Sequence, residues 1–135
     1  MIAEFGHFVL VLALAVALLQ AIAPLYLMQR ETALALPLAR RAALAQFILV
    51  LLAFLALTYG FVRSDFSLAV VFANSHVAKP LIYKIAGVWG NHEGSMLLWV
   101  LIVAAYGAAY GAFSKTQDVF SARVLMVQGW LGGAF

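Results

Sequence analysis

Long apolar stretches without charge dominate this sequence and limit what it can fold into. The first runs from Phe5 to Met28 and is interrupted only by His7 and Gln20. About 20 apolar residues suffice for a helix to cross a bilayer, so this stretch is long enough to span one. Soluble domains are roughly 45–50% apolar and about 25% charged, whereas this chain is 67% apolar and 10% charged. We therefore expect an all-α fold, a polytopic integral membrane helical bundle.

The apolar stretches divide the chain into expected spans. They predict three spans and the start of a fourth, at about 5–28, 42–62, 94–113 and 124–135. The last is too short to cross, and we expect it to be truncated. A secretory signal is the alternative for the first stretch, because Ala21-Ile22-Ala23 resembles a cleavage site. The acidic start at Glu4 and the proline that follows the triplet favour a span.

Residues within the first stretch and at its start carry structural expectations. Pro24 cannot donate a backbone hydrogen bond to the carbonyl of Gln20, so a kink is expected there. The Gln20 amide is then expected to bond to a neighbouring helix or to the loosened backbone. Glu4 and His7 are one helical turn apart at the outer end of this span, where we expect them to form an interfacial pair.

Polar segments connect the expected spans. Gln29 to Arg41 is predicted to be a polar connection, and segment 63–93 is too polar to cross a bilayer. Within the latter, Pro80 suits a helix start. An apolar stripe at three- and four-residue intervals follows it, formed by Leu81, Ile82, Ile85, Val88 and Trp89. This pattern is typical of an amphipathic helix lying in the membrane interface.

Basic residues indicate an orientation. The short connection 29–41 holds three Lys or Arg and the connection after the third span holds two, whereas segment 63–93 spreads three over a longer stretch. Short loops dense in Lys and Arg tend to stay cytoplasmic. The count therefore predicts an external amino terminus and an external segment 63–93. The net charge of +3 lies in these connections rather than in a basic stripe, so no nucleic-acid binding is expected.

The segment from Trp89 to Trp99 concentrates polar groups at the start of an apolar stretch. The candidate residues for a haem-site or partner-binding motif are Trp89, Gly90, Asn91, His92, Glu93, Gly94, Ser95 and Trp99. If a helix continued through the segment, Trp89, His92, Glu93, Met96 and Trp99 would share one arc of roughly 120°. The motif would then present two tryptophans, an imidazole and a carboxylate at the water–lipid boundary.

Two interpretations of this motif stay open. His92 could ligate haem iron or a metal, relay protons or bind a partner. No second or third ligand stands at helical spacing, however, and adjacent His92 and Glu93 point about 100° apart. The plainer interpretation is that Asn91 caps the helix and Glu93 stabilises its positive end. Trp89 and Trp99 are then anchors in the aromatic belt rather than stacking platforms.

The remaining residues supply no reaction chemistry. The chain has no cysteine, and no nucleophile–base pair, phosphate loop or carboxylate pair is present. We expect no catalytic residue and no metal site in it.

Gly107 and Gly111, with Ala104, Ala108 and Ala112, form a small-residue face that permits close helix contact, although small residues are common in membrane helices generally.

The segment Val88–Trp99 closely resembles part of the CcmF family, the haem lyases of cytochrome c maturation, and their NrfE-like relatives. The resemblance continues along the chain in Glu4-Phe5-Gly6-His7-Phe8, Ala23-Pro24-Leu25, Asp65–Val71, Asn74-Ser75-His76, Lys79–Lys84 and Ala122–Leu125. It implies that the chain is the N-terminal transmembrane region of a longer protein in the bacterial inner membrane.

The resemblance also implies a function and partners. The family attaches haem to the Cys-x-x-Cys-His thiols of apocytochrome c on the periplasmic side. It works with CcmH- and CcmI-like subunits and takes haem from a CcmE-like chaperone. The family's axial histidines lie beyond the part that this chain matches, so the resemblance implies a scaffold rather than a catalytic part. The alternative is a non-enzymatic subunit for haem transport or assembly, in which the motif binds a partner.

Overall fold

The computed structural model describes residues 2–30, 32–114 and 119–134, and these residues form helices with no strand among them. The helices are α1 (Ile2–Arg30), α2 (Thr32–Arg63), α3 (Ala69–Asn74), α4 (Leu81–Gly87), α5 (His92–Phe113) and α6 (Val119–Ala134). Three of them, α1, α2 and α5, are long and apolar enough to cross a membrane. The expected all-α membrane bundle is therefore confirmed.

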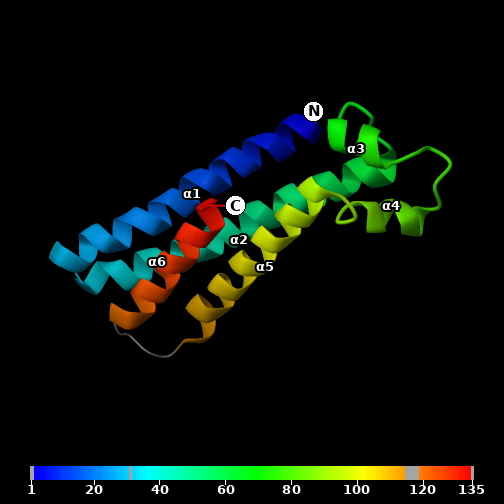
Figure 1. Ribbon diagram of the computed structural model, residues 1–135. Helices are drawn as coiled ribbons and strands as arrows, with labels where there is room; N and C mark the ends of the chain where they lie inside the picture. Colours follow the sequence, from blue (N-terminus) through cyan, green and yellow to red (C-terminus); the bar gives the residue numbers. More distant parts are fainter. Residues whose placement is uncertain (1, 31, 115–118, 135) are drawn as a thin grey trace.

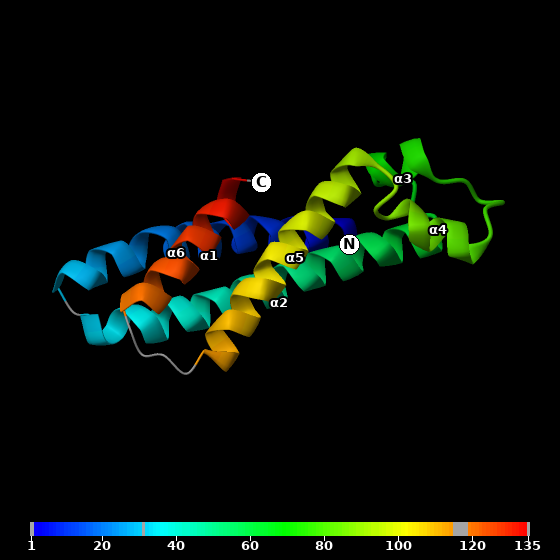
Figure 2. The same cartoon turned by 60° about the horizontal axis from the view of Figure 1, so that its bottom comes forward.

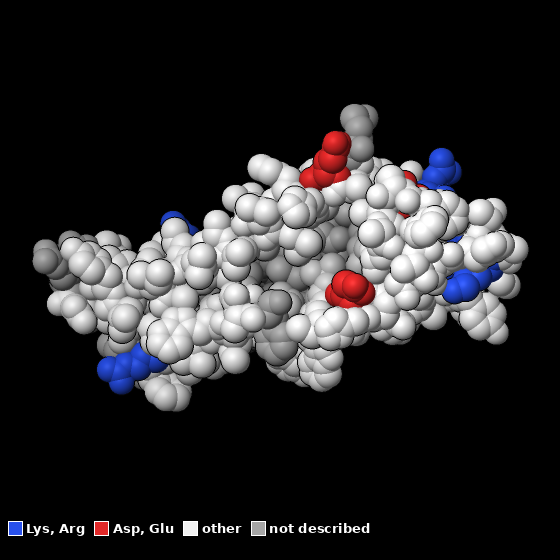
Figure 3. All heavy atoms as spheres, turned by 45° about the horizontal axis from the view of Figure 1, so that its top comes forward, with Lys and Arg blue, Asp and Glu red and all other residues white. Residues whose placement is uncertain are grey.

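The long helices form an elongated bundle. α1 and α2 lie side by side along most of their length, and α5 packs across α2 (Figures 1 and 2). α6 contacts α1, α2 and α5. The short helices α3 and α4 gather at the end of the bundle where α2 finishes and α5 begins (Figure 1). Lys and Arg lie toward the two ends of the molecule, and most of the visible surface between them is uncharged (Figure 3).

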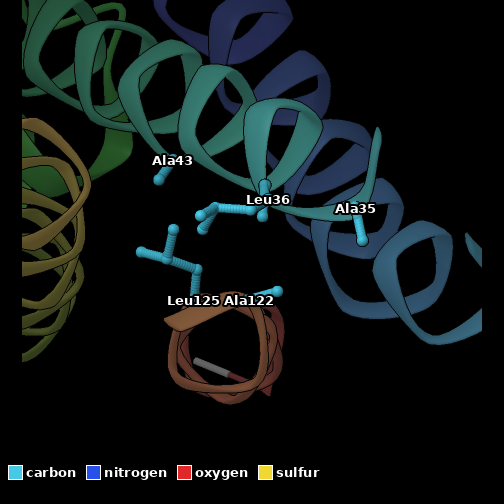
Figure 4. Packing of buried hydrophobic residues seen from close by; sticks show 6 residues of the cluster. Ala35, Leu36, Ala43, Ala122 and Leu125 are labelled. Carbon is cyan, nitrogen blue, oxygen red and sulfur yellow. The ribbon is translucent and has the colours of Figure 1, made fainter. Parts of the chain in front are cut away.

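Small side chains make the core of this bundle. On α1, Ala13, Ala17 and Ala21 are buried at four-residue intervals, so they lie along one face. On α2 a similar stripe packs against α6, and Leu36 and Leu125 point toward one another between the two helices (Figure 4). Helices in lipid associate through close packing of this kind, because lipid tails are as apolar as a leucine side chain.

A second core fixes α3 and α4 to the end of α2. Its buried members are Phe61 of α2, Val71 of α3 and Val88, which follows α4. α2 ends at a left-handed residue, Ser64, with φ 54°. The backbone N–H of Asp65 then donates to the carbonyl of Gly60 at 2.9 Å, as in a Schellman helix end. The chain therefore turns sharply out of the long helix and packs back against it.

One expectation about the connections is wrong. Residues 29–41 do not form a polar connection, because α1 continues to Arg30 and α2 begins at Thr32. Segment 32–39 consists largely of alanine and leucine, which are strong helix formers. Arg40 lies within α2, and its Nη2 donates to the carbonyl of Ser114 at 2.7 Å, at the end of α5. A basic side chain that caps a neighbouring helix can stay inside a helix of its own.

The last apolar stretch is also part of a longer helix than the sequence indicates. α6 starts at Val119, five residues before the expected 124, and runs to Ala134. Its first turn includes Ser121, which is buried beside the hydroxyl of Tyr110 on α5 at 3.3 Å. A polar residue with a partner on an adjacent helix therefore extends the helix beyond the apolar stretch.

Candidate functional site

The motif from Trp89 to Trp99 forms the joint between α4 and α5. The single helix considered for this segment is wrong, because α4 ends at Gly87 and α5 begins at His92. Trp89 lies before α5 and does not belong to its helical arc. The break occurs at Asn91, whose φ of −127° and ψ of 168° are extended rather than helical. His92, Glu93, Met96 and Trp99 do lie on α5.

The Asn91 side chain ties the two helices together. Its Oδ1 accepts a hydrogen bond from the backbone N–H of Gly94 at 2.7 Å, which confirms the expected cap of α5. Its Nδ2 donates to the carbonyl of Gly87 at 2.8 Å and to that of Val88 at 3.3 Å. One amide therefore satisfies a donor at the start of α5 and two acceptors at the end of α4.

Glycine is required at one position of this joint. Gly94 is buried, and a Cβ atom on it would overlap the carbonyl oxygen of Val88. The backbones of the joint therefore approach too closely for any other residue. Gly90 differs, because a Cβ there would lie 3.2 Å from the carbonyl oxygen of Ala86, a tight contact that a small shift can relieve. The hydroxyl of Ser95 donates to the carbonyl of His92 at 2.9 Å and closes the first turn.

The other motif residues face outward. His92 and Glu93 are exposed, and so are Trp89 and Trp99. Glu93 lies in the first turn of α5, where a carboxylate stabilises the positive end of the helix dipole. Among the described residues no group of three His, Cys, Asp or Glu side chains lies close enough to hold a metal ion. The motif thus combines a tightly built backbone joint with outward-facing side chains.

Glu93 stands where two apolar crevices meet. One, of about 290 Å³, lies between α1, α2, α5 and α6, and its lining includes Glu93, Met96 and Gln46. The other, of about 200 Å³, is lined by Glu93 and by residues of α1, α2 and the segment before α3, Leu68 among them. Figure 3 shows acidic atoms beside a hollow in the otherwise uncharged surface. An apolar cleft with few polar groups is the usual form of a ligand site.

Three glutamines form a buried polar chain that the sequence analysis did not identify as a set. Gln20 Nε2 donates to the carbonyl of Leu125 at 2.6 Å and to Gln128 Oε1 at 2.5 Å. Gln128 Nε2 in turn donates to Gln46 Oε1 at 3.0 Å. The expectation that Gln20 bonds to a neighbouring helix is confirmed. Glutamines isolated within apolar stretches were the only signal of this chain in the sequence, and their pairing depends on how the helices pack.

Glycines on adjacent helices make room for these glutamines. A Cβ atom on Gly107 would lie 2.5 Å from Gln128 Cδ, and one on Gly132 would overlap the Gln46 amide nitrogen. The close contact predicted for Gly107 and Gly111 is confirmed, since Gly111 packs against Arg40. Ala112, predicted to widen this face, is exposed instead. It lies one residue beyond Gly111, so the helical rotation of about 100° per residue turns it away from the contact.

A turn at the end of α2 lowers the pKa of a carboxyl group, that of Asp65. The Ser67 hydroxyl donates to Asp65 Oδ1 at 2.7 Å, and the Ser67 backbone N–H donates to the same oxygen at 3.1 Å. Both bonds stabilise the carboxylate and lower the pKa of Asp65, the hydroxyl more than the backbone. The Asp65 carboxylate therefore caps this short turn. The pairing of Glu4 with His7 stays a prediction.

Known proteins resemble the whole chain. The sequence is 58% identical to the cytochrome c-type biogenesis protein ccl1 of Rhodobacter capsulatus, 49% to CycK of Rhizobium meliloti and 46% to CcmF of Pseudomonas aeruginosa, in each case over 100% of the chain. The chain spans about one fifth of the length of these curated relatives, 20–21% of each. No protein-family model matches it, and no solved structure matches it either.

Proposed function

We propose, from the premise that this chain belongs to the family of the cytochrome c-type biogenesis proteins CcmF and CycK, that it is a membrane-embedded scaffold of cytochrome c maturation. The observation that carries the proposal is the match over the full chain at up to 58% identity. The activity concerned is the covalent attachment of haem to the Cys-x-x-Cys-His thiols of apocytochrome c. The chain contributes to it by shaping the site and contains no reacting group.

The geometry of the motif supports a scaffold role. The Asn91 side chain bonds to both helices of the joint, and Gly94 is the point where the two backbones approach most closely. These residues set the direction in which α5 leaves the α3–α4 end of the bundle. A joint of this kind can hold neighbouring parts of a larger protein at a fixed angle.

His92 does not fit an axial haem ligand. It is exposed at the start of α5, and no described residue hydrogen-bonds to its ring. A haem ligand would need an imidazole aimed into a pocket, usually with its second ring nitrogen held by a partner. We therefore assign no haem-ligating step to this part of the chain.

The cellular setting follows from the family and the basic residues. We propose that the amino terminus, the joint and segment 63–93 lie on the periplasmic side of the bacterial inner membrane, since Arg30, Arg40 and Arg41 lie around the junction of α1 and α2, at the opposite end of the bundle. The partners proposed are CcmH- and CcmI-like subunits, a CcmE-like haem chaperone and the apocytochrome.

The second candidate function, a haem-transporting or assembly subunit without enzymatic activity, is favoured by the outward-facing Trp89 and Trp99, which suit a partner surface.

Complementation tests the function. The full-length protein containing this chain is expressed in a strain that lacks its own CcmF-type protein, and covalent haem staining measures the c-type cytochromes. We expect restoration by the unaltered protein and by Gly90→Ala, and strongly reduced staining with Gly94→Ala at equal protein level. If the unaltered protein restores no c-type cytochrome, the assignment to cytochrome c maturation is wrong.

A further inference from the structure

We propose that segment 64–91, hereafter the interfacial segment, lies in the headgroup layer of the bilayer with its apolar side chains inserted toward the acyl chains. This inference concerns a lipid-binding surface and does not depend on the proposed function. It starts from the helices α3 and α4, whose exposed side chains are mostly apolar and aromatic.

The exposure of these side chains is high. Phe72 of α3 is 73% exposed, and on α4 Ile82 and Tyr83 are 72% and 65% exposed. No residue of α4 is buried. Leu81, Ile82 and Tyr83 are consecutive, so at about 100° per residue they cover most of the helix circumference. Soluble surfaces rarely present such a contiguous apolar patch unless it binds a membrane or a protein.

The polar groups of the same segment are turned toward its own backbone and side chains. Lys84 Nζ donates to Ser64 Oγ at 2.7 Å, and Lys79 Nζ donates to the carbonyl of Asn74 at 2.8 Å. Asn74 Nδ2 donates to the carbonyl of Val70 at 2.9 Å. These bonds hold several polar groups of the segment close to its backbone, and the exposed surface combines apolar side chains with exposed His76 and Lys79. A lysine held in this way can still place its charge among headgroup phosphates.

The bundle places the interfacial segment at the membrane boundary. The core of Phe61, Val71 and Val88 holds it on the end of α2, beside the first turn of α5. α5 has 22 residues, which at 1.5 Å each is roughly 33 Å, close to the hydrocarbon thickness of about 30 Å. A segment attached at that end cannot lie far from the headgroups.

Charge and aromatic content favour lipid over water or a protein partner. Between Ser64 and Asn91 the sequence has two lysines and one acidic residue, Asp65. The resulting net charge of +1 is compatible with a surface of anionic headgroups. Tyr83 and Trp89 are exposed there, and amphipathic rings of this type concentrate at membrane interfaces.

The absence of cysteine permits a direct test. Ile82→Cys and Phe72→Cys each create a unique site for a nitroxide label. The unattached label in buffer is the water control, and Leu55→Cys, on the exposed apolar side of α2, is the lipid control. The full chain is placed in vesicles of phosphatidylcholine with one quarter phosphatidylglycerol. Collision rates are then measured with dissolved oxygen, which concentrates in lipid, and with a nickel chelate, which stays in water.

The proposal predicts that labels at both Ile82 and Phe72 collide more with oxygen than with the nickel chelate, as at Leu55, while the unattached label shows the reverse. Greater collision with nickel at both test positions would place the segment in water and overturn the proposal. Protection from both reagents would also overturn it, because the surface would then be covered by a second copy of the chain. Agreement between the two positions guards against distortion by one label.

Discussion

Gln20 on α1 donates its side-chain amide to the side-chain oxygen of Gln128 on α6, across 108 positions of sequence. Gln128 in turn donates a hydrogen bond to Gln46 of α2, and all three glutamines are at most 9% exposed. In a lipid-facing bundle an unpaired amide costs more than in water, because no solvent replaces the missing partner. The glutamine chain therefore specifies which helices meet, while the apolar residues around it specify only that they are buried.

Replacing the middle member of this chain should loosen the bundle. Gln128→Leu leaves the Gln20 amide without its side-chain acceptor and Gln46 Oε1 without its donor. We expect a loss of about 1–2 kcal/mol in unfolding free energy, in the range measured for polar contacts between membrane helices. Unfolding by steric trapping in bicelles measures it. Gln29→Leu, at the exposed end of α1, is the control and should change little.

The neighbouring glycines Gly132 and Gly133 should respond differently to the same substitution. A Cβ atom on Gly132 would overlap the Gln46 amide, whereas one on Gly133 would lie 3.8 Å from Ala17 Cβ, an ordinary contact. We expect Gly132→Ala to lower the unfolding free energy by about 1–3 kcal/mol through overpacking. Gly133→Ala should be nearly neutral. Equal effects of the two substitutions in the same unfolding assay would argue against the fit between Gly132 and Gln46.

Two substitutions of Asn91 separate its roles as hydrogen-bond acceptor and as hydrogen-bond donor. Asn91→Asp keeps an oxygen to accept from the Gly94 N–H but loses the donor to the carbonyl of Gly87. Asn91→Ala loses both, so we expect a cost of about 0.5–2 kcal/mol for the cap. Hydrogen exchange of the backbone amides of residues 92–95 should rise more for alanine than for aspartate. If exchange is the same in both variants and the parent, Asn91 is not the cap of α5 in the membrane.

Asp65 predicts a pH dependence at the end of α2. Hydrogen bonds from Ser67 depress its pKa below the usual 3.8 in the folded protein. A depressed pKa stabilises the folded state above the unfolded pKa, and this stabilisation is lost as the pH falls through the folded value. The local turn should therefore loosen only below about pH 4. In a carboxyl-carbon NMR titration, Ser67→Ala should raise the Asp65 pKa, and an unchanged midpoint would show that the hydroxyl bond does not form.

The sequence predicted the elements that follow from apolar length alone. The stretch from Phe5 to Met28 lies within α1, and the expected span 94–113 differs from α5 by two residues at its start. The prediction from apolar length failed at the start of α2. Arg40 can lie inside that helix because its side chain bonds to the carbonyl of Ser114, at the end of α5. Charge near an apolar stretch marks a loop only if the charge must reach water.

The structure of the motif from Trp89 to Trp99 could be predicted only in part, because some of its contacts are local in sequence and others are not. The cap at Asn91 depends on neighbours three positions away, so local sequence sufficed to find it. The closure of Gly94 on Val88 depends on the angle between two helices, which no local pattern encodes. The continuous arc from Trp89 to Trp99 was wrong because an extended residue at 91 interrupts the helix.

The most direct test of the scaffold account is the haem absorption spectrum of the full-length protein carrying His92→Ala. The account predicts bound-haem absorption equal to that of the unaltered protein, because His92 is exposed and no described residue hydrogen-bonds to its ring. Loss of that absorption, with the protein still present in the membrane at its normal level, would contradict the account and make His92 a haem ligand.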